Sequence, residues 1–283
     1  MKKIIPAAEY HRIDALSAST IKTLLQKSAA HARMQQMNPH DDPTLQQERG
    51  TILHALTLGE DDIIQLIDAP DFRTKAAQQA RDDARQADRI PVIADKAAEL
   101  YAIAATARQQ IETTLSIDIQ TDGQAETSLV WRDGQVQCKA RPDWLANDDR
   151  LILDLKFTEL TQSAWIKSLS SNGYDVQSEW YRRAVRMDLE QECRFIFAVC
   201  ETLPPYPVYF VELTGAYRAI ADVKIERALQ IWGACIESNV FPCYSQEIIE
   251  LDPPAWEMAT AEETAEVTHG FDREAFLFGR VRT

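Results

Sequence analysis

Residues 126–157 constrain the fold of this chain more than any other segment. The stretches "ETSLVW" and "QVQCKA" alternate apolar and polar residues around "RDG", so they predict two antiparallel strands joined by an Asp-Gly turn. The following "RLILDLKF" predicts a third strand, in which Asp154 and Lys156 stand among apolar residues that require burial. We therefore expect a sheet that carries charged side chains at one edge.

Helical patterns precede and follow these strands. Residues 17–37 begin with Ser and Thr caps and predict one amphipathic helix, and residues 50–60 predict a shorter one. The Ala- and Gln-rich residues 72–115 predict helices with a large solvated face, interrupted at Pro91. After the third strand, the patterns predict helices at 162–169, 174–188 and 216–238 and strands at 193–200 and 207–213.

These elements predict an α/β (α+β) domain with a mixed sheet. With 283 residues, of which 45% are hydrophobic, the chain is long enough to bury one large core. We expect a single domain over residues 1–283, with a mainly helical part at 1–120, the sheet core at 121–255 and a C-terminal tail at 256–283.

Composition excludes several classes of protein. The net charge of −14 repels a polyanion at long range, which counts against a protein that coats nucleic acid. No apolar run of about 18 residues is present, and the N-terminal residues become polar too early for a secretory signal. The five cysteines lack CxxC spacing, so neither a disulfide framework nor a zinc site is expected. These features predict a soluble, cytoplasmic protein with reduced thiols.

The charged residues of the second and third strands suggest a metal site. Asp143 follows the second strand and Asp154 lies within the third, so adjacent pairing of these strands would bring both carboxylates to one end of the sheet. Asp154 and Lys156 are two residues apart and share a face. The carboxylates and the backbone carbonyl of Leu155 are hard oxygen ligands of the kind that Mg²⁺ prefers. The alternative is a surface ion pair in a Pro-Asp turn, because this pattern is short and common.

Other polar residues extend the candidate site. Glu126 begins the first strand of the hairpin and could reach the same edge. His54 is set among apolar residues, so it is either a histidine packed in the core or a metal ligand whose helix covers the acidic edge. Tyr174, Gln177 and Tyr181 share one helical face, which suits contacts with phosphates or bases but equally suits packing.

The order of these residues resembles the PD-(D/E)xK nuclease superfamily, and within it the RecE-like (exonuclease VIII) nuclease domain of phages and prophages. The resemblance runs through "RPD", "DLK" and "YDVQSEWY". The N-terminal "LSASTIKTLL", "RGTILHALTL" and "DFRTKAAQQARDDA" are also similar to that family, so the resemblance extends from about residue 10 to about residue 255. It implies a restriction-endonuclease-like core with additional N-terminal helices.

The resemblance also implies an activity. Such a protein degrades one strand of linear double-stranded DNA from its 5′ end with Mg²⁺, for which Mn²⁺ can substitute. It leaves a 3′ overhang for a single-strand annealing protein during recombination, and it forms a homo-oligomeric ring around DNA.

Phe157 is a departure from the family pattern, since the family more often has threonine directly after the lysine. The implied roles are metal ligation by His54, Asp143, Asp154 and the carbonyl of Leu155, catalysis by Lys156, a further acid at Glu126, and a Gln-x-x-x-Tyr helix at Gln177 and Tyr181.

The path of DNA over an acidic protein is not evident from the sequence. The contact residues we expect are Gln177, Tyr181, Tyr174 and Arg141, and any of the available cations could instead solvate a helix face. Two alternatives to an exonuclease stay open: a related endonuclease or single-strand nuclease, and a catalytically silent nuclease-like module that binds DNA or mimics it. The available cations are Arg33, Arg49, Lys139, Arg141, Lys167, Arg182, Arg183 and Arg186.

Overall fold

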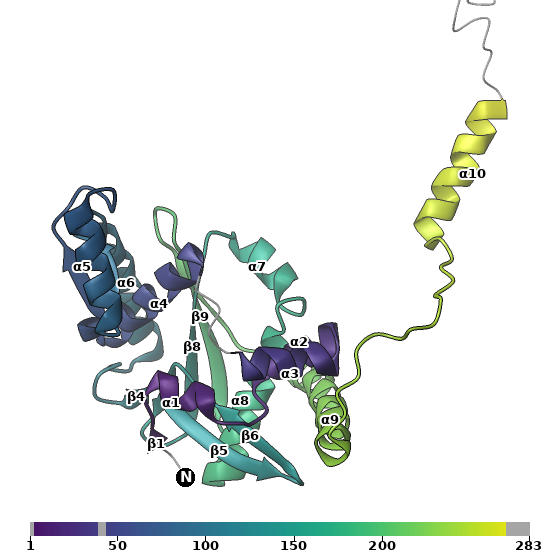
Figure 1. The fold of residues 1–283 in the computed structure, drawn as a ribbon, viewed down its shortest axis with the longest axis horizontal. Helices are drawn as coiled ribbons and strands as arrows, with labels where there is room; N and C mark the ends of the chain where they lie inside the picture. Colours follow the sequence, from purple (N-terminus) through teal and green to yellow (C-terminus); the bar gives the residue numbers. More distant parts are fainter. Residues whose placement is uncertain (1–2, 39–43, 270–283) are drawn as a thin grey trace, which may run out of the picture. The chain divides into compact units, whose positions relative to one another are not determined.

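The computed structural model describes residues 3–38 and 44–269 (Figure 1). Contacts divide the chain into two compact units, Met1–Cys243 and Tyr244–Thr283. Within the described residues of the second unit lies the helix α10 (Ala255–His269). The division therefore falls before residue 256, where we expected the C-terminal tail to begin.

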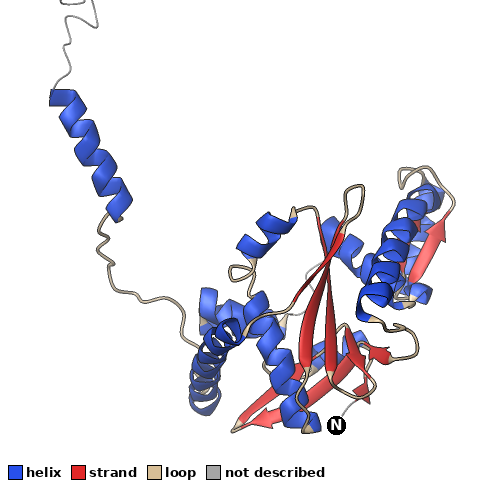
Figure 2. Cartoon of the chain, turned by 180° about the vertical axis from the view of Figure 1, so that it is seen from behind, coloured by secondary structure: helices blue, strands red, loops and turns tan. Residues whose placement is uncertain are grey.

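A five-stranded mixed sheet in the order β10-β9-β8-β7-β4 forms the centre of the first unit (Figures 1 and 2). The inner strands β8 and β9 run parallel, and the other neighbours are antiparallel. Helices cover both faces of the parallel pair, which explains the near-continuous apolar runs in its sequence. The predicted α/β mixed-sheet fold is confirmed. The strands are β4 (Gly123–Ala125), β7 (Trp144–Ala146), β8 (Leu151–Thr158), β9 (Arg194–Glu201) and β10 (Val208–Val211).

The predicted hairpin forms, but in a separate sheet of order β1-β5-β6. The expected pairing of its second strand with strand 150–157 is wrong, because β8 pairs instead with the short strand β7, where Trp144 lies opposite Leu153. Pro142 has no backbone N–H to extend the ladder beyond β6, and the chain passes into the other sheet there. The strands of this second sheet are β1 (Lys3–Ile4), β5 (Thr127–Asp133) and β6 (Val136–Ala140).

The N-terminal part is mainly helical and differs from the prediction at two points. Residues 17–37 form two helices, since Ser28 is extended and its Oγ accepts a hydrogen bond from the N–H of His31 at 3.3 Å, which begins a new helix. Pro91 lies in a strand, β3, that pairs in parallel with β2. The elements are α1 (Ala7–Arg12), α2 (Ala18–Gln26), α3 (Ala29–Met37), α4 (Leu45–Leu58), η1 (Asp61–Ile63), β2 (Ile64–Ile67), α5 (Lys75–Gln86), β3 (Ile90–Ile93) and α6 (Ala94–Leu115).

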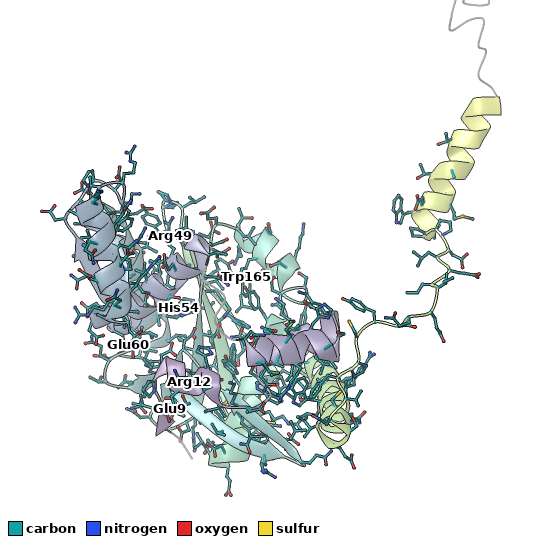
Figure 3. The ribbon with its side chains drawn as sticks, viewed as in Figure 1. Glu9, Arg12, Arg49, His54, Glu60 and Trp165 are labelled. Atoms are coloured by element: carbon teal, nitrogen blue, oxygen red, sulfur yellow. The ribbon has the colours of Figure 1, made fainter. Side chains whose placement is uncertain are left out.

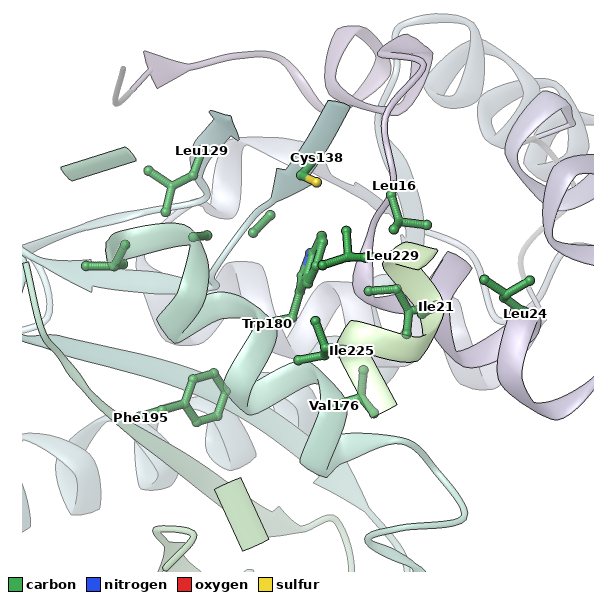
Figure 4. Packing of buried hydrophobic residues seen from close by; sticks show 14 of the residues in the cluster. Leu16, Ile21, Leu24, Leu129, Cys138, Val176, Trp180, Phe195, Ile225 and Leu229 are labelled. Carbon is green, nitrogen blue, oxygen red and sulfur yellow. The ribbon is translucent and has the colours of Figure 1, made fainter. Parts of the chain in front are cut away.

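Two hydrophobic clusters cover the two faces of β8 and β9. Figure 4 shows part of the first, in which Trp180 and Ile225 pack with residues of the N-terminal helices. In the second, Leu153 and Leu155 of β8 pack with Ile111 of α6. Side chains alternate along a strand, so Asp154 and Lys156 lie on the face opposite Leu155. The helices that follow β8 are α7 (Gln162–Ser168), α8 (Tyr174–Leu189) and α9 (Gly215–Ser238).

Two expectations from composition bear on the described residues. None of their helices is both long and apolar enough to cross a membrane. All five cysteines are free: four are buried, and Cys243 is exposed.

Candidate active site

Asp143 and Asp154 lie next to each other, although the strands that we expected to join them do not pair. Asp143 immediately precedes β7, and its Oδ2 accepts a hydrogen bond from the backbone N–H of Leu155 at 2.7 Å. This bond holds the carboxylate against β8, one residue away from Asp154. Burial raises the pKa of Asp143, although the ammonium of Lys156 opposes this effect.

Both carboxylate oxygens of Asp154 have partners. Oδ1 pairs with Nζ of Lys156, and Oδ2 accepts a hydrogen bond from Nε2 of Gln177 at 2.6 Å. The Asp154 side chain is fully buried, and burial raises its pKa to about 6 despite the nearby lysine. Burial alone would lower the pKa of Lys156, but Asp154 and Asp143 raise it above its ordinary value. Lys156 is therefore a protonated, hydrogen-bonded cation at neutral pH.

His54 lies in the second half of α4, and this helix has well-defined ends. A capping box of Thr44 and Gln47 starts the helix, and Gly59 ends it in the left-handed conformation, with φ 84°. Nδ1 of His54 lies 3.3 Å from Oδ2 of Asp143. The imidazole also packs against the ring of Phe157 in an edge-to-face arrangement, with the ring centroids 5.5 Å apart. The imidazole therefore reaches the carboxylates rather than packing only among leucines.

The imidazole of His54 is neutral at neutral pH. Burial and then Lys156 lower its pKa to about 4, against the opposing effect of Asp154. A neutral ring retains a nitrogen lone pair that can bind a metal. The site therefore combines residues of the central strands with His54 of α4 (Figure 3) and Gln177 of α8.

Glu126 lies in the connection between β4 and β5, with φ 53°, rather than at the start of the hairpin as we expected. Its backbone N–H donates to the carbonyl of Asp143 at 2.9 Å, which ties this left-handed turn to the site. Its carboxylate pairs with Arg141. Burial and the neighbouring Asp143 raise the pKa of Glu126 to about 7, while Arg141 opposes the increase.

A cleft of about 870 Å³ adjoins this site. His54, Glu126, Arg141, Gln177 and Tyr181 are among the residues that line it. The N-terminal helices and the segment before α8 also contribute to the lining, mostly with uncharged hydrogen-bonding groups and with the cation Lys22. The uncharged residues are Ser17, Ser19, Thr20, Gln35, Gln36, Asn38, Gln47, Thr51 and Asn172.

Sequence reasoning missed two residues of the cleft, Tyr10 and Glu60. The guanidinium carbon of Arg141 lies over the ring of Tyr10, 5.5 Å from the ring centroid. Glu60 follows α4, the helix that carries His54 (Figure 3). The segment "AAEYHRID" carries no pattern that would have revealed the role of Tyr10. Glu60 ends the helical pattern of residues 50–60, six positions after His54, and its acidic side chain was the available signal.

Most of the candidate DNA-binding cations have structural partners. Nζ of Lys139 is buried and donates to the backbone carbonyls of Tyr10, His11 and Ile13 at 2.9–3.3 Å. The arginines of the N-terminal helices and α8 form ion pairs, so they are not free to follow a DNA backbone. These pairs are Arg33–Asp14, Arg49–Glu99, Arg182–Glu179, Arg183–Asp133, Arg183–Glu226 and Arg186–Glu179.

The donor chemistry of the site fits a hard divalent cation. Asp143, Asp154 and Glu126 lie close together, so the site is rich in carboxylate oxygens. Mg²⁺ favours such carboxylate oxygens and a backbone carbonyl like that of Leu155.

The described residues 3–38 and 44–269 hold no group of three or more His, Cys, Asp or Glu side chains already arranged for a metal ion. The oxygens of Asp154 are engaged by Lys156 and Gln177. Each carboxylate oxygen has two lone pairs, so these contacts leave Asp154 able to bind an ion as well. The residues that would hold the ion are Asp143, Asp154, the carbonyl of Leu155 and His54.

One solved structure agrees with this fold, and a second is similar only in part. A crystal structure named "Putative exonuclease", from Eubacterium rectale, is similar with a TM-score of 0.56 and 14% identity, over 90% of this chain and 96% of that chain. An alkaline exonuclease from Laribacter hongkongensis, at 15% identity over 68% of this chain and 95% of that one, has a TM-score of only 0.30. No curated protein matches the chain in sequence.

The family model described as a PDDEXK-like domain of unknown function (DUF3799) matches residues 17–251. This range includes every candidate residue named above except Tyr10. The resemblance to the PD-(D/E)xK superfamily is thereby confirmed: the chain belongs to this PDDEXK-like family.

Proposed function

We propose that this protein is a Mg²⁺-dependent nuclease that hydrolyses phosphodiester bonds of DNA. The observation that carries the proposal is the bond from the N–H of Leu155 to Asp143, at 2.7 Å, which places this carboxylate beside Asp154 and Lys156. A buried carboxylate and a partly buried one beside a protonated lysine suit metal-assisted hydrolysis of a phosphodiester. A surface ion pair would not bury Asp154 completely.

Each residue of the site has a proposed role in hydrolysis. Bound Mg²⁺ would lower the pKa of a coordinated water to roughly 7 and stabilise negative charge on the phosphate. Asp143 and Asp154 supply oxygen ligands, and Gln177 orients Asp154 through its 2.6 Å hydrogen bond. Lys156 donates to the attacking water or to the phosphate oxygen, where negative charge develops in the transition state. The neutral imidazole of His54 completes the site.

We further propose that the protein acts on linear double-stranded DNA from the 5′ end and leaves 3′ overhangs for a single-strand annealing protein. This finer proposal is supported by the resemblance to RecE-like nucleases and by the exonuclease name of the structural neighbour from Eubacterium rectale. A homo-oligomeric ring and a cytoplasmic, phage-encoded role in recombination belong to the same proposal. Mn²⁺ would substitute for Mg²⁺.

Digestion of end-labelled linear duplex, compared with a covalently closed circle, tests the proposal. With Mg²⁺ we expect release of the 5′ label, retention of the 3′ label in the single-stranded overhang, and an intact circle. Cleavage of the circle would instead identify an endonuclease, and digestion of single strands alone a single-strand nuclease. Absence of any cleavage under Mg²⁺ or Mn²⁺ would favour the silent DNA-binding or DNA-mimic module.

A further inference from the structure

Two aromatic rings lie close to the ammonium of Lys156. Its Nζ lies 5.1 Å from the centroid of Tyr174 and 5.7 Å from that of Phe197. Both distances are within the range of a cation–π interaction, which is strongest where water is excluded. Lys156 is only 16% exposed, so the rings contribute to its placement in addition to the ion pair with Asp154.

Trp165 holds these rings in place. It is fully buried on α7 and stacks on Tyr174, with centroids 5.3 Å apart and ring planes 19° apart. Its edge meets Phe197 at 5.6 Å and Tyr209 at 6.1 Å. Residues of α7, α8, β9 and β10 therefore build a single aromatic cluster against one side chain of β8.

Tyr174 has a different environment from the other two residues of its helical face. Gln177 and Tyr181 are among the residues that line the cleft, whereas Tyr174, like Asp154 and Lys156, is not. Tyr174 is the first residue of α8, and its ring contacts Trp165 and the ammonium of Lys156. These contacts suggest a role for Tyr174 at the lysine itself.

Resting on the proposed nuclease function, we propose that Tyr174 is a positioning residue, whose ring holds the ammonium of Lys156 at the reacting phosphate. A lysine side chain has a flexible four-carbon stem, so one carboxylate partner leaves it several conformations. The ring faces restrict that freedom without accepting a hydrogen bond. They also hold the ammonium independently of Asp154, whose oxygens the metal would share.

Three variants test this role: Tyr174→Phe, which keeps the ring, Tyr174→Leu, which removes it, and Tyr209→Leu as a matched control. Tyr209 contacts the same Trp165, but the described cation–ring contacts of Lys156 involve Tyr174 and Phe197 only. We expect Tyr174→Leu to lower kcat by roughly tenfold or more with KM for DNA nearly unchanged. Tyr174→Phe should retain the kcat of the wild type, and Tyr209→Leu should lower thermal stability alone.

A second readout does not depend on catalysis. Acetylation of Lys156 in the metal-free protein, followed by mass spectrometry, should be faster in Tyr174→Leu than in the wild type, Tyr174→Phe or Tyr209→Leu. A wild type without nuclease activity would refute the proposed function, while this labelling rate would still test the positioning.

Three results would overturn the inference. Equal kcat and equal labelling in Tyr174→Leu and the wild type would show that the ring does not hold the lysine. A raised KM with unchanged kcat would make Tyr174 a DNA contact after all. An equal loss of kcat in Tyr174→Phe would assign the effect to the hydroxyl group instead of the ring.

Discussion

Replacing Lys156 with methionine should destabilise the metal-free protein, because it leaves the charge of Asp154 buried without a cation. The Asp154 side chain is fully buried, and after the change only the neutral amide of Gln177 contacts its oxygens directly. Removing one partner of a buried ion pair costs about 3–5 kcal/mol. The hydrogen bond from the amide of Gln177 remains, so we expect a cost at the lower end of this range, about 3 kcal/mol.

The penalty should depend on pH, with a definite sign. The folded pKa of Asp154, about 6, exceeds its ordinary value of 3.8. Protonation of this carboxyl therefore stabilises the folded protein at low pH, and that contribution is lost as the pH rises through 6. Lys156 opposes the upward shift, and its removal should raise the folded pKa further. The variant should therefore differ from the wild type more at pH 8 than at pH 5, where a proton neutralises Asp154.

The double variant Asp154→Asn/Lys156→Met is the matched control, since it removes both charges and keeps the shape of the site. Its free energy of unfolding at pH 8 should return to within about 1 kcal/mol of the wild type. Urea denaturation followed by circular dichroism in EDTA, at pH 5 and pH 8, measures all three proteins. A loss below about 0.5 kcal/mol for Lys156→Met, or a double variant as unstable as the single one, would refute the buried pair.

Further predictions concern Asp154, His54 and Lys139. Asp154→Ala should abolish Mg²⁺ binding in isothermal titration calorimetry, because the site loses a carboxylate ligand; undiminished binding would remove Asp154 from the site. His54→Gln should weaken metal binding and change the ratio of Mg²⁺- to Mn²⁺-supported rates, whereas a lower melting temperature with an unchanged metal profile would assign His54 to the core. Lys139→Met should lower the melting temperature, because three carbonyls lose their donor, with DNA affinity unchanged. Weaker DNA binding without loss of stability would restore Lys139 as a DNA contact.

The sequence predicted the elements whose pattern is long and local. The strands at 193–200 and 150–157 and the helix at 216–238 match β9, β8 and α9 within one or two residues. The strand β7 has three residues, too few for any periodicity, so the pairing partner of β8 could not be predicted. The strand β3 contains Pro91, which signals an interruption rather than a strand.

The candidate site was predictable in its residue types and less so in its contacts. The sequence pointed to Asp143, Asp154 and Lys156 because charged side chains are uncommon in and beside buried strands. The structure places these three side chains together. The partners of Lys139 lie more than 120 residues away in sequence, at Tyr10 and Ile13, and no local pattern relates them. The contact of Tyr174 with Lys156 likewise depends on how α7 and α8 pack against β8 and β9, which only tertiary structure determines.

The central claim is that the carboxylates beside β8 form a metal-dependent nuclease centre. The most direct test is the rate of nucleotide release from linear duplex DNA by the wild type and by Asp154→Asn, each in Mg²⁺ and in EDTA. We predict release by the wild type in Mg²⁺ and none under the other three conditions, with both proteins folded by circular dichroism. Release by Asp154→Asn at the rate of the wild type, or by the wild type in EDTA, would contradict the claim.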